Sequence, residues 1–227
     1  MYAFKFSGNY NVKLISTTLS ILALTLAAQT TAIAGQAISW NLSRDMMAGI
    51  TTNPKKEWTF MHNASGIHNP VNYTLLASYS KACIGENNLG VNFLNCWQDL
   101  PNAQFSLIGT ATKTFTQGIT QTRGVPLLHP DLNNQAVLRW KSPISGNITI
   151  LGRISDIDSR CGNGISWSLD KGTTTLDSGI LDNGSGISFL QQNISVTKGT
   201  SLYIIVDANG DQHCDSTNLD LIITSQQ

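Results

Sequence analysis

The chain has 227 residues, of which 41% are hydrophobic and 12% charged, and its 14 basic and 14 acidic residues give a formal net charge of +0 at pH 7. Proteins bind nucleic acids and anionic membrane surfaces through basic patches. The sequence contains no run of basic residues, so its composition argues against both kinds of partner.

The N-terminal residues 1–34 have the features of a secretory signal peptide. Two lysines and no acidic residue precede an apolar run at 19–28, and small residues lead up to Ala34. We expect cleavage after Ala34, which leaves a single secreted domain at 35–227, either extracellular or periplasmic. A membrane anchor is the alternative, but the apolar run is short for a bilayer span, and no later segment is apolar enough to cross one.

Along the predicted mature chain, the hydrophobic pattern has a period of two. At 136–141 and at 165–170, one face of the segment is apolar and the other carries the polar residues, which is typical of half-buried strands. Further β-branched runs are NITILGRIS, ISFLQQNISV, SLYIIVDA and NLDLIIT, separated by Gly, Asn and Asp turns. The pattern predicts an all-β sandwich without an amphipathic helix. Residues 63–72 and 118–134 are expected to be long loops, where binding sites often lie.

Four cysteines in an oxidising compartment are expected to form two disulfides, and three pairings are formally open. Cys83 and Cys96 bracket one short polar loop, whereas Cys161 and Cys214 each lie in a loop rich in Asp and Gly after a strand. The spacing therefore favours Cys83–Cys96 and Cys161–Cys214. A zinc site is the alternative, but the sequence has no Cys-x-x-Cys pair.

Four short signatures are spread over most of the predicted mature chain. They are Asn53-Pro54-x-x-x-Trp58, Leu128-His129-Pro130, Leu138-Arg139-Trp140-x-x-Pro143-x-x-Gly146 and Asp215-x-Thr217. Together they resemble a jelly-roll module of secreted bacterial proteins, which is similar to carbohydrate-binding β-sandwiches. The resemblance implies a jelly-roll fold and a glycan or another cell-surface ligand as the partner.

Motifs for catalysis are missing from the sequence. It contains no Gly-x-Ser-x-Gly elbow, no His-Glu-x-x-His pair and no glycine-rich phosphate loop after a strand. Glu57 and Glu86 are the only glutamates, although aspartates are numerous, so a pair of carboxylates for glycoside hydrolysis does not stand out. We expect no catalytic residue, and a small secreted hydrolase is kept as the least favoured alternative.

One of the five tryptophans is a candidate platform for a sugar ring, whose apolar face stacks on aromatic side chains. Trp97 alternates with Asn95 and Asp99, whose polar groups would bind sugar hydroxyls, and His129 is a further candidate ligand. Burial of Trp97 is an equally open interpretation. The tryptophans expected to lie in the core are Trp58, Trp140 and Trp167.

The segment VDANGDQHCDST near the C-terminus has the spacing of a calcium loop. The oxygen-bearing residues at alternate positions are Asp207, Asn209 and Asp211, with Asp215 four further on. The alternative is an Asx-rich turn in which these side chains bond their own loop, and this alternative is the favoured one. If calcium binds, a Cys161–Cys214 bridge would bring Asp156 and Asp158 alongside as the remaining ligands.

Taken together, the residues predict a secreted, disulfide-stapled, jelly-roll-like β-sandwich that binds a glycan or another cell-surface ligand without catalysis. A structural or adhesive surface protein with a protein partner is the second hypothesis.

Overall fold

The computed structural model describes residues 36–84, 90–99 and 103–226. The predicted signal peptide and its cleavage site lie outside these residues. Gly35–Gln227 form one compact unit. Among the described residues, no helix is both long and apolar enough to cross a membrane.

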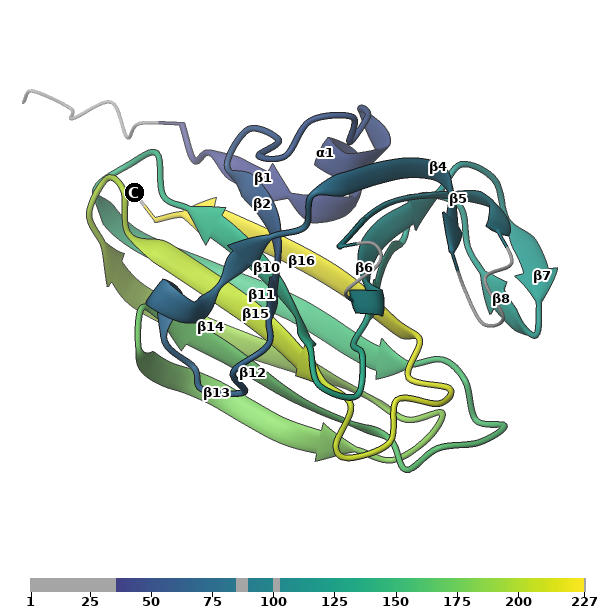
Figure 1. Cartoon of the computed structure of the whole chain (residues 1–227). Coiled ribbons are helices and arrows are strands. Elements are labelled where there is room, and N and C mark those ends of the chain that lie inside the picture. Colours follow the sequence, from purple (N-terminus) through teal and green to yellow (C-terminus); the bar gives the residue numbers. More distant parts are fainter. Residues whose placement is uncertain (1–35, 85–89, 100–102, 227) are drawn as a thin grey trace, which may run out of the picture. The chain divides into compact units, whose positions relative to one another are not determined.

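The compact unit consists mainly of two antiparallel sheets (Figure 1). In spatial order the eight-stranded sheet contains β14 (Gly186–Val196), β11 (Gly146–Asp156), β16 (Thr217–Ser225), β9 (Pro126–His129), β6 (Ala103–Ala111), β5 (Gly90–Asp99) and β4 (Ser78–Ile84), and β1 (Ser39–Asn41) also pairs with β16. The six-stranded sheet contains β13 (Thr174–Leu181), β12 (Ile165–Lys171), β15 (Ser201–Asp207), β10 (Gln135–Lys141), β2 (Trp58–Asn63) and β3 (Thr74–Leu75). The remaining elements are the hairpin of β7 (Phe115–Gln117) and β8 (Ile119–Gln121), the helix α1 (Leu42–Met47) and the 3-10 turn η1 (Pro70–Asn72).

From β10 onward the chain passes back and forth between the two sheets. Strands β10, β12, β13 and β15 belong to the six-stranded sheet, and β11, β14 and β16 belong to the eight-stranded one. Repeated crossing between two packed antiparallel sheets is the arrangement of a jelly-roll-like β-sandwich. The all-β prediction is confirmed.

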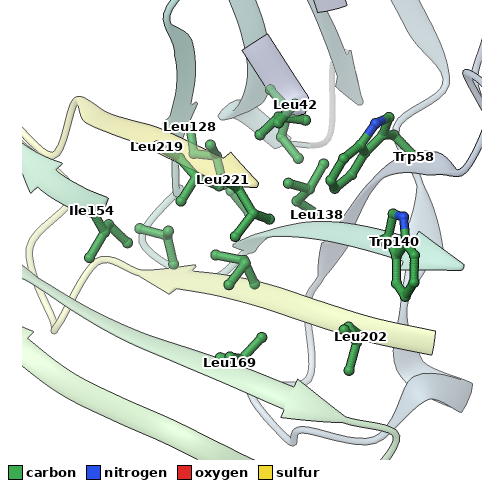
Figure 2. Packing of buried hydrophobic residues seen from close by; sticks show 14 of the residues in the cluster. Leu42, Trp58, Leu128, Leu138, Trp140, Ile154, Leu169, Leu202, Leu219 and Leu221 are labelled. Atoms are coloured by element: carbon green, nitrogen blue, oxygen red, sulfur yellow. The ribbon is translucent and has the colours of Figure 1, made fainter. Parts of the chain in front are cut away.

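The main hydrophobic core lies between the sheets (Figure 2). Trp58 of β2 and Trp140 of β10 point into it from one sheet, and Leu221 of β16 points into it from the other. Burying a side chain of this size stabilises the fold by about 1.5–3 kcal/mol. Trp167 is also buried and stacks on Phe189 with ring centroids 5.0 Å apart, so the prediction of three core tryptophans is confirmed.

The predicted long loop at 118–134 is partly wrong, because it contains β8 and β9. Leu127 and Leu128 of β9 are buried, since β9 pairs with β6 on one side and with β16 on the other. The apolar run in β9 is only Pro-Leu-Leu, which is too short to show an alternating pattern.

The helix α1 is a second difference from the sequence prediction. Asn41 caps it, because its side-chain oxygen accepts a hydrogen bond from the backbone N–H of Arg44 at 2.8 Å. Leu42 and Met46, one turn apart, are buried in the main core. Six residues are too few for a helical period to stand out in a sequence.

A buried carboxylate anchors α1. Asp45 is 2% exposed and accepts hydrogen bonds from Nε1 of Trp58 at 3.1 Å, Nζ of Lys56 at 3.2 Å and Nε of Arg44 at 3.2 Å. Burial by itself raises the pKa of Asp45, but the hydrogen bonds from Trp58, Arg44 and Lys56 outweigh it and hold the pKa below its usual value.

Both predicted disulfides are present. Cys83–Cys96 joins β4 to β5 with the Cα atoms 5.8 Å apart, and Cys161–Cys214 joins the β11–β12 loop to the β15–β16 loop with the Cα atoms 5.5 Å apart. The second bridge fixes the two Asp-rich loops to each other.

Candidate functional site

The outer face of the six-stranded sheet carries polar side chains on its middle strands. Ser166, Ser168 and Asp170 of β12 point away from the core, because the residues between them alternate into it. On the neighbouring strand β15, Asp207 lies opposite Ser166 and Ile205 lies opposite Ser168. The face therefore places hydroxyl and carboxylate groups beside a patch of apolar surface.

The segment between β2 and β4 covers part of this face. Its Tyr73 packs with Met61, Val137, Tyr203 and Ile205 in a small apolar cluster, and the rings of Tyr73 and Tyr203 meet edge to face at 4.9 Å. This contact holds the preceding loop, and with it His68, above the sheet.

A hydrogen-bonded network fixes the orientation of His68. Gln135 accepts a bond from Nδ2 of Asn63 at 2.6 Å, and its Nε2 lies 2.8 Å from Oδ2 of Asp207 and 3.3 Å from Nε2 of His68. Because the amide nitrogen of Gln135 can only donate, Nε2 of His68 accepts. The proton of the neutral ring therefore lies on Nδ1.

The other ring nitrogen of His68 lies beside two side chains of β12. Its Nδ1 is 3.3 Å from Oγ of Ser168 and 3.1 Å from Oδ2 of Asp170. Asp170 is fully buried, and among the described residues neither of its carboxylate oxygens has a partner with hydrogen-bond geometry. A buried carboxylate with unused acceptor positions is costly unless a ligand or water supplies donors.

A cavity of about 330 Å³ opens on the same face. Hydroxyl-bearing, carboxylate, imidazole and apolar residues line it together: Ser166, Ser168, Thr175, Ser178, Asp207, His68, Ile180 and Ile205. A few convergent polar groups beside apolar surface are the usual make-up of a small-molecule site. We define these residues as the outer-face cavity and include Asp170 and Gln135, which do not line it but contact His68 and Asp207.

The Asp-rich loops form a second unusual region. Asp215 is fully buried, and within residues 36–84, 90–99 and 103–226 neither of its carboxylate oxygens has a hydrogen-bond partner. Burial, and to a smaller extent the charges of Asp156, Asp211 and Asp207, raise the pKa of Asp215 to about 8. The structure thus brings these four predicted ligands close enough for three of them to affect the pKa of Asp215.

Asp156 and Asp158 from the other loop differ from each other. Asp156 is 2% exposed and accepts the backbone N–H of Asp158 at 2.9 Å through Oδ1, while its Oδ2 has no partner in the part of the chain that the structure describes. Burial raises the pKa of Asp156 to about 6. Asp158 is paired with Arg160 at 2.6 Å and 2.7 Å, and these hydrogen bonds lower its pKa.

The other predicted ligands make the local bonds of an Asx-rich turn. Asp207 accepts the backbone N–H of Asn209 at 2.9 Å, and Asp211 accepts the backbone N–H of His213 at 3.1 Å and lies 2.5 Å from its ring Nδ1. Among the described residues, no group of three or more His, Cys, Asp or Glu side chains could hold a metal ion. The six-residue calcium sphere stays a prediction.

The predicted platform residue Trp97 is half-buried. Its Nε1 donates to the carbonyl of Ile50 at 2.5 Å, and its ring packs against the main core and against Tyr79 at a centroid distance of 5.6 Å. Asp99, two residues on, lies 3.4 Å from Nε2 of His62. These contacts fix Trp97 and Asp99 in place, and a role in sugar binding stays a prediction.

The structure places His129 and Asn95 apart from the outer-face cavity. His129 ends β9, with its Nδ1 2.7 Å from the carbonyl oxygen of Pro130. Asn95 lies on β5, opposite Thr110 of β6 in the eight-stranded sheet. The outer-face cavity, by contrast, belongs to the six-stranded sheet.

Sequence reasoning missed the residues of the outer-face cavity. His68, Gln135 and Asp170 come from three segments far apart in the chain, so no local motif joins them. Two signals were available: the polar residues alternating along 165–170 and the histidine in the predicted loop 63–72.

No protein-family model and no curated protein matches the sequence. Among solved structures, the chain is similar to CBM51 from Clostridium perfringens GH95 in complex with methyl-galactose, with 10% identity and a TM-score of 0.38 over 83% of this chain and 100% of that one. It is also similar to the K3 cleaved adhesin domain of Lys-gingipain from Porphyromonas gingivalis w83, with 12% identity and a TM-score of 0.41 over 82% and 98%.

A third similar structure holds CBM51-2, in complex with GlcNAc, and INT domains from Clostridium perfringens ZmpB. The identity is 10% and the TM-score 0.35 over 47% of this chain, which spans only 22% of that one. At this level of similarity, none of the three structures decides what this chain binds.

Proposed function

We propose that the protein is a non-catalytic, secreted binding module that holds a glycan in the outer-face cavity. The carrying observation is a cavity of about 330 Å³ whose polar wall is held in place, because the buried Asp170 lies 3.1 Å from Nδ1 of His68 and Gln135 donates to Asp207. Sugar hydroxyls would donate to Asp207, the carboxylate that lines this cavity.

The chemistry of the wall also suits a sugar. Ser166, Ser168 and Ser178 both donate and accept hydrogen bonds, and Asp207 accepts them, which matches the mixed character of sugar hydroxyls. The Gln135 network already holds Asp207 and His68, so a ligand would meet side chains with little freedom left to lose.

The arrangement of Ser168, His68 and Asp170 favours binding over hydrolysis. In a Ser-His-Asp triad the serine and the aspartate bond opposite nitrogens of the imidazole. Here Oγ of Ser168 and Oδ2 of Asp170 both lie beside the same nitrogen, Nδ1, at 3.3 Å and 3.1 Å. The imidazole cannot relay a proton between them in this arrangement.

A protein partner is the second candidate function, and a specific surface favours it. Leu190, Leu151 and Ile222 lie side by side on β14, β11 and β16 in the register of the eight-stranded sheet. They are 53%, 50% and 37% exposed. A contiguous apolar row on an outer face is typical of a protein contact surface.

A glycan-array screen of the purified protein, followed by titration of the best ligand, tests the proposal. Ser178→Phe fills the cavity from its exposed rim on β13 and should weaken binding by about 10-fold or more. Ser188→Phe, at an exposed position of β14 in the other sheet, is the matched control and should bind normally. Loss of binding in both variants, or in neither, would contradict the cavity as the site.

Trp97→Ala tests the sequence-predicted platform in the same assay. Binding that is lost in Trp97→Ala and kept in Ser178→Phe would move the site to β5. No binding to any glycan would favour the protein partner, and turnover of a bound polysaccharide would contradict a non-catalytic role.

We further propose calcium as the cofactor, bound at the Asp-rich loops. We also propose that the protein is exported after cleavage near Ala34.

A further inference from the structure

Two buried carboxylates without adequate partners lie close together where the Asp-rich loops leave the eight-stranded sheet. Asp156 ends β11, opposite Thr217 of β16, and the backbone N–H of Ile157 donates to the carbonyl of Ser216 at 2.8 Å. Asp215 precedes Ser216, so both carboxylates start from adjoining stretches of backbone. The Cys161–Cys214 bridge holds the same two loops together.

Burial without partners is what sets this pair apart from ordinary acidic turns. Asp215 is 0% exposed with both oxygens unpartnered among the described residues, and Asp156 is 2% exposed with Oδ2 unpartnered there. Leaving a charged group buried and unpaired costs several kcal/mol, which proteins avoid by pairing the charge or coordinating a metal.

The backbone of the two loops packs closely beside Asp215. Gly162 has φ of +81°, and a Cβ placed on it would collide with the carbonyl oxygen of His213 and lie 3.5 Å from Oδ1 of Asp215. A residue with a side chain would not fit at this position, so the glycine lets the two loops approach each other closely beside Asp215. Asp156 also borders a hollow of about 540 Å³, which offers a route from solvent.

We infer that Asp156 and Asp215 are the carboxylate ligands of one calcium ion that joins the β11–β12 loop to the β15–β16 loop. Calcium takes about 6–8 oxygen ligands and accepts backbone carbonyls and water beside carboxylates, so two acidic side chains suffice. A zinc or copper ion is disfavoured, because both nearby cysteines are in a disulfide and Nδ1 of His213 is engaged with Asp211.

These two ligands differ from the ligand set that the spacing of the Asp-rich segment predicts. The one-three-five pattern would centre the ion on Asp207, Asn209 and Asp211, yet Asp207 is already bonded to Gln135 and Asn209, and Asp211 is 44% exposed beside His213. The buried pair, rather than the turn, has the unused oxygens. The inference is independent of the glycan proposal, since it concerns other residues, beside β11 and β16 of the eight-stranded sheet.

Calorimetric titration of the chelator-treated protein with CaCl₂, together with thermal melting, tests the inference. We expect binding of one calcium ion, a melting temperature that rises in millimolar calcium and falls back with chelator, and a much weaker response to MgCl₂, which demands stricter octahedral geometry. Asp215→Asn and Asp156→Asn should each weaken calcium binding by on the order of 100-fold. At pH 9, where both carboxyl groups are ionised, both variants should melt in chelator no lower than the parent, because each removes an unpaired buried charge.

Asp211→Asn is the matched control from the same loop. It should weaken binding only a few-fold, through loss of a nearby charge. Absence of a stoichiometric calcium heat, a response retained in both buried variants, or a response lost in Asp211→Asn alone would overturn the assignment. If Asp215→Asn fails to fold, Asp156→Asn decides, because it leaves Asp215 in place.

Discussion

Asp45 and Asp215 are both buried aspartates, and their surroundings are opposite. Asp45 receives donors from Trp58, Lys56 and Arg44, whereas Asp215 has no hydrogen-bond donor among the described residues and faces other carboxylates. Accordingly, the pKa of Asp45 is held below its usual value and that of Asp215 is raised to about 8.

The comparison shows how a structural carboxylate differs from one that awaits a ligand. Burial costs the charged form of both residues the same kind of hydration energy. At Asp45 the protein offsets this cost with its own side chains, so the site is complete. At Asp215 no side chain among the described residues offsets the cost, so the carboxyl group keeps its proton up to about pH 8 unless a cation binds there.

The largest expected effect concerns the covalent link that holds the Asp215 region together. The 53-residue separation of Cys161 and Cys214 predicts that replacing both with Ser lowers the free energy of unfolding by about 4 kcal/mol. Replacing Cys83 and Cys96, which are 13 residues apart, should cost about 3 kcal/mol. Urea unfolding measures both.

The calcium response separates the two bridges further. It should be lost or strongly weakened without Cys161–Cys214 and kept without Cys83–Cys96. An intact response in the first double variant would show that the loops hold their geometry without the bridge.

The second prediction tests whether Asp45 is as complete as its bonds indicate. Asp45→Ala leaves the indole N–H of Trp58 buried without an acceptor and removes the partner of two cations, so we expect a loss of about 3 kcal/mol in urea unfolding. Asp45→Asn keeps an acceptor for Trp58 and should lose less. A loss below about 1 kcal/mol in Asp45→Ala would place this site among weak surface ion pairs.

The contrast between these two aspartates could not be predicted from the sequence. Alternation with period two predicts strands such as β10 and β12 because a residue's parity decides its face. Cysteine spacing likewise predicts both disulfides, since Cys83 and Cys96 bracket one short loop, and Cys161 and Cys214 each lie in a loop that follows a strand. The alternation of residues along a strand cannot show which donors bond to a buried carboxylate. Trp58 and Lys56 donate to Asp45 from a different part of the chain.

The candidate sites show the same limit. The sequence shows that the segment around Asp207 and Asp215 is rich in oxygen-bearing side chains. Only the structure shows that Asp215 and the more distant Asp156 are buried. The outer-face cavity depends on His68 crossing from its loop to Asp170, a long-range contact that no short motif encodes.

The most specific prediction, and the smallest per unit of change, is the opposite pH dependence of the two regions in chelator. Asp215 has a folded pKa raised to about 8 from 3.8, so between these values the folded state holds a proton that the unfolded state has released. The contribution of Asp215 to the free energy of unfolding is therefore fully present below about pH 4. It is lost as the pH rises toward 8, by up to about 1.4 kcal/mol per pH unit. Asp156 adds to this loss up to about pH 6.

Asp45 has the reverse sign, because its folded pKa is depressed. Its contribution is present above the unfolded value of 3.8 and is lost as the pH falls through the lower folded value. Urea unfolding at pH 3 to 9 in chelator should therefore show Asp215→Asn flattening the slope between pH 6 and 8 and Asp45→Asn flattening it only at the acid end. Saturating calcium should also remove the upper slope, since a bound cation keeps Asp215 ionised in the folded state. If the free energy of unfolding had the same pH dependence in Asp215→Asn as in the parent, Asp215 would have a hydrogen-bond partner in solution. It would then not differ from Asp45.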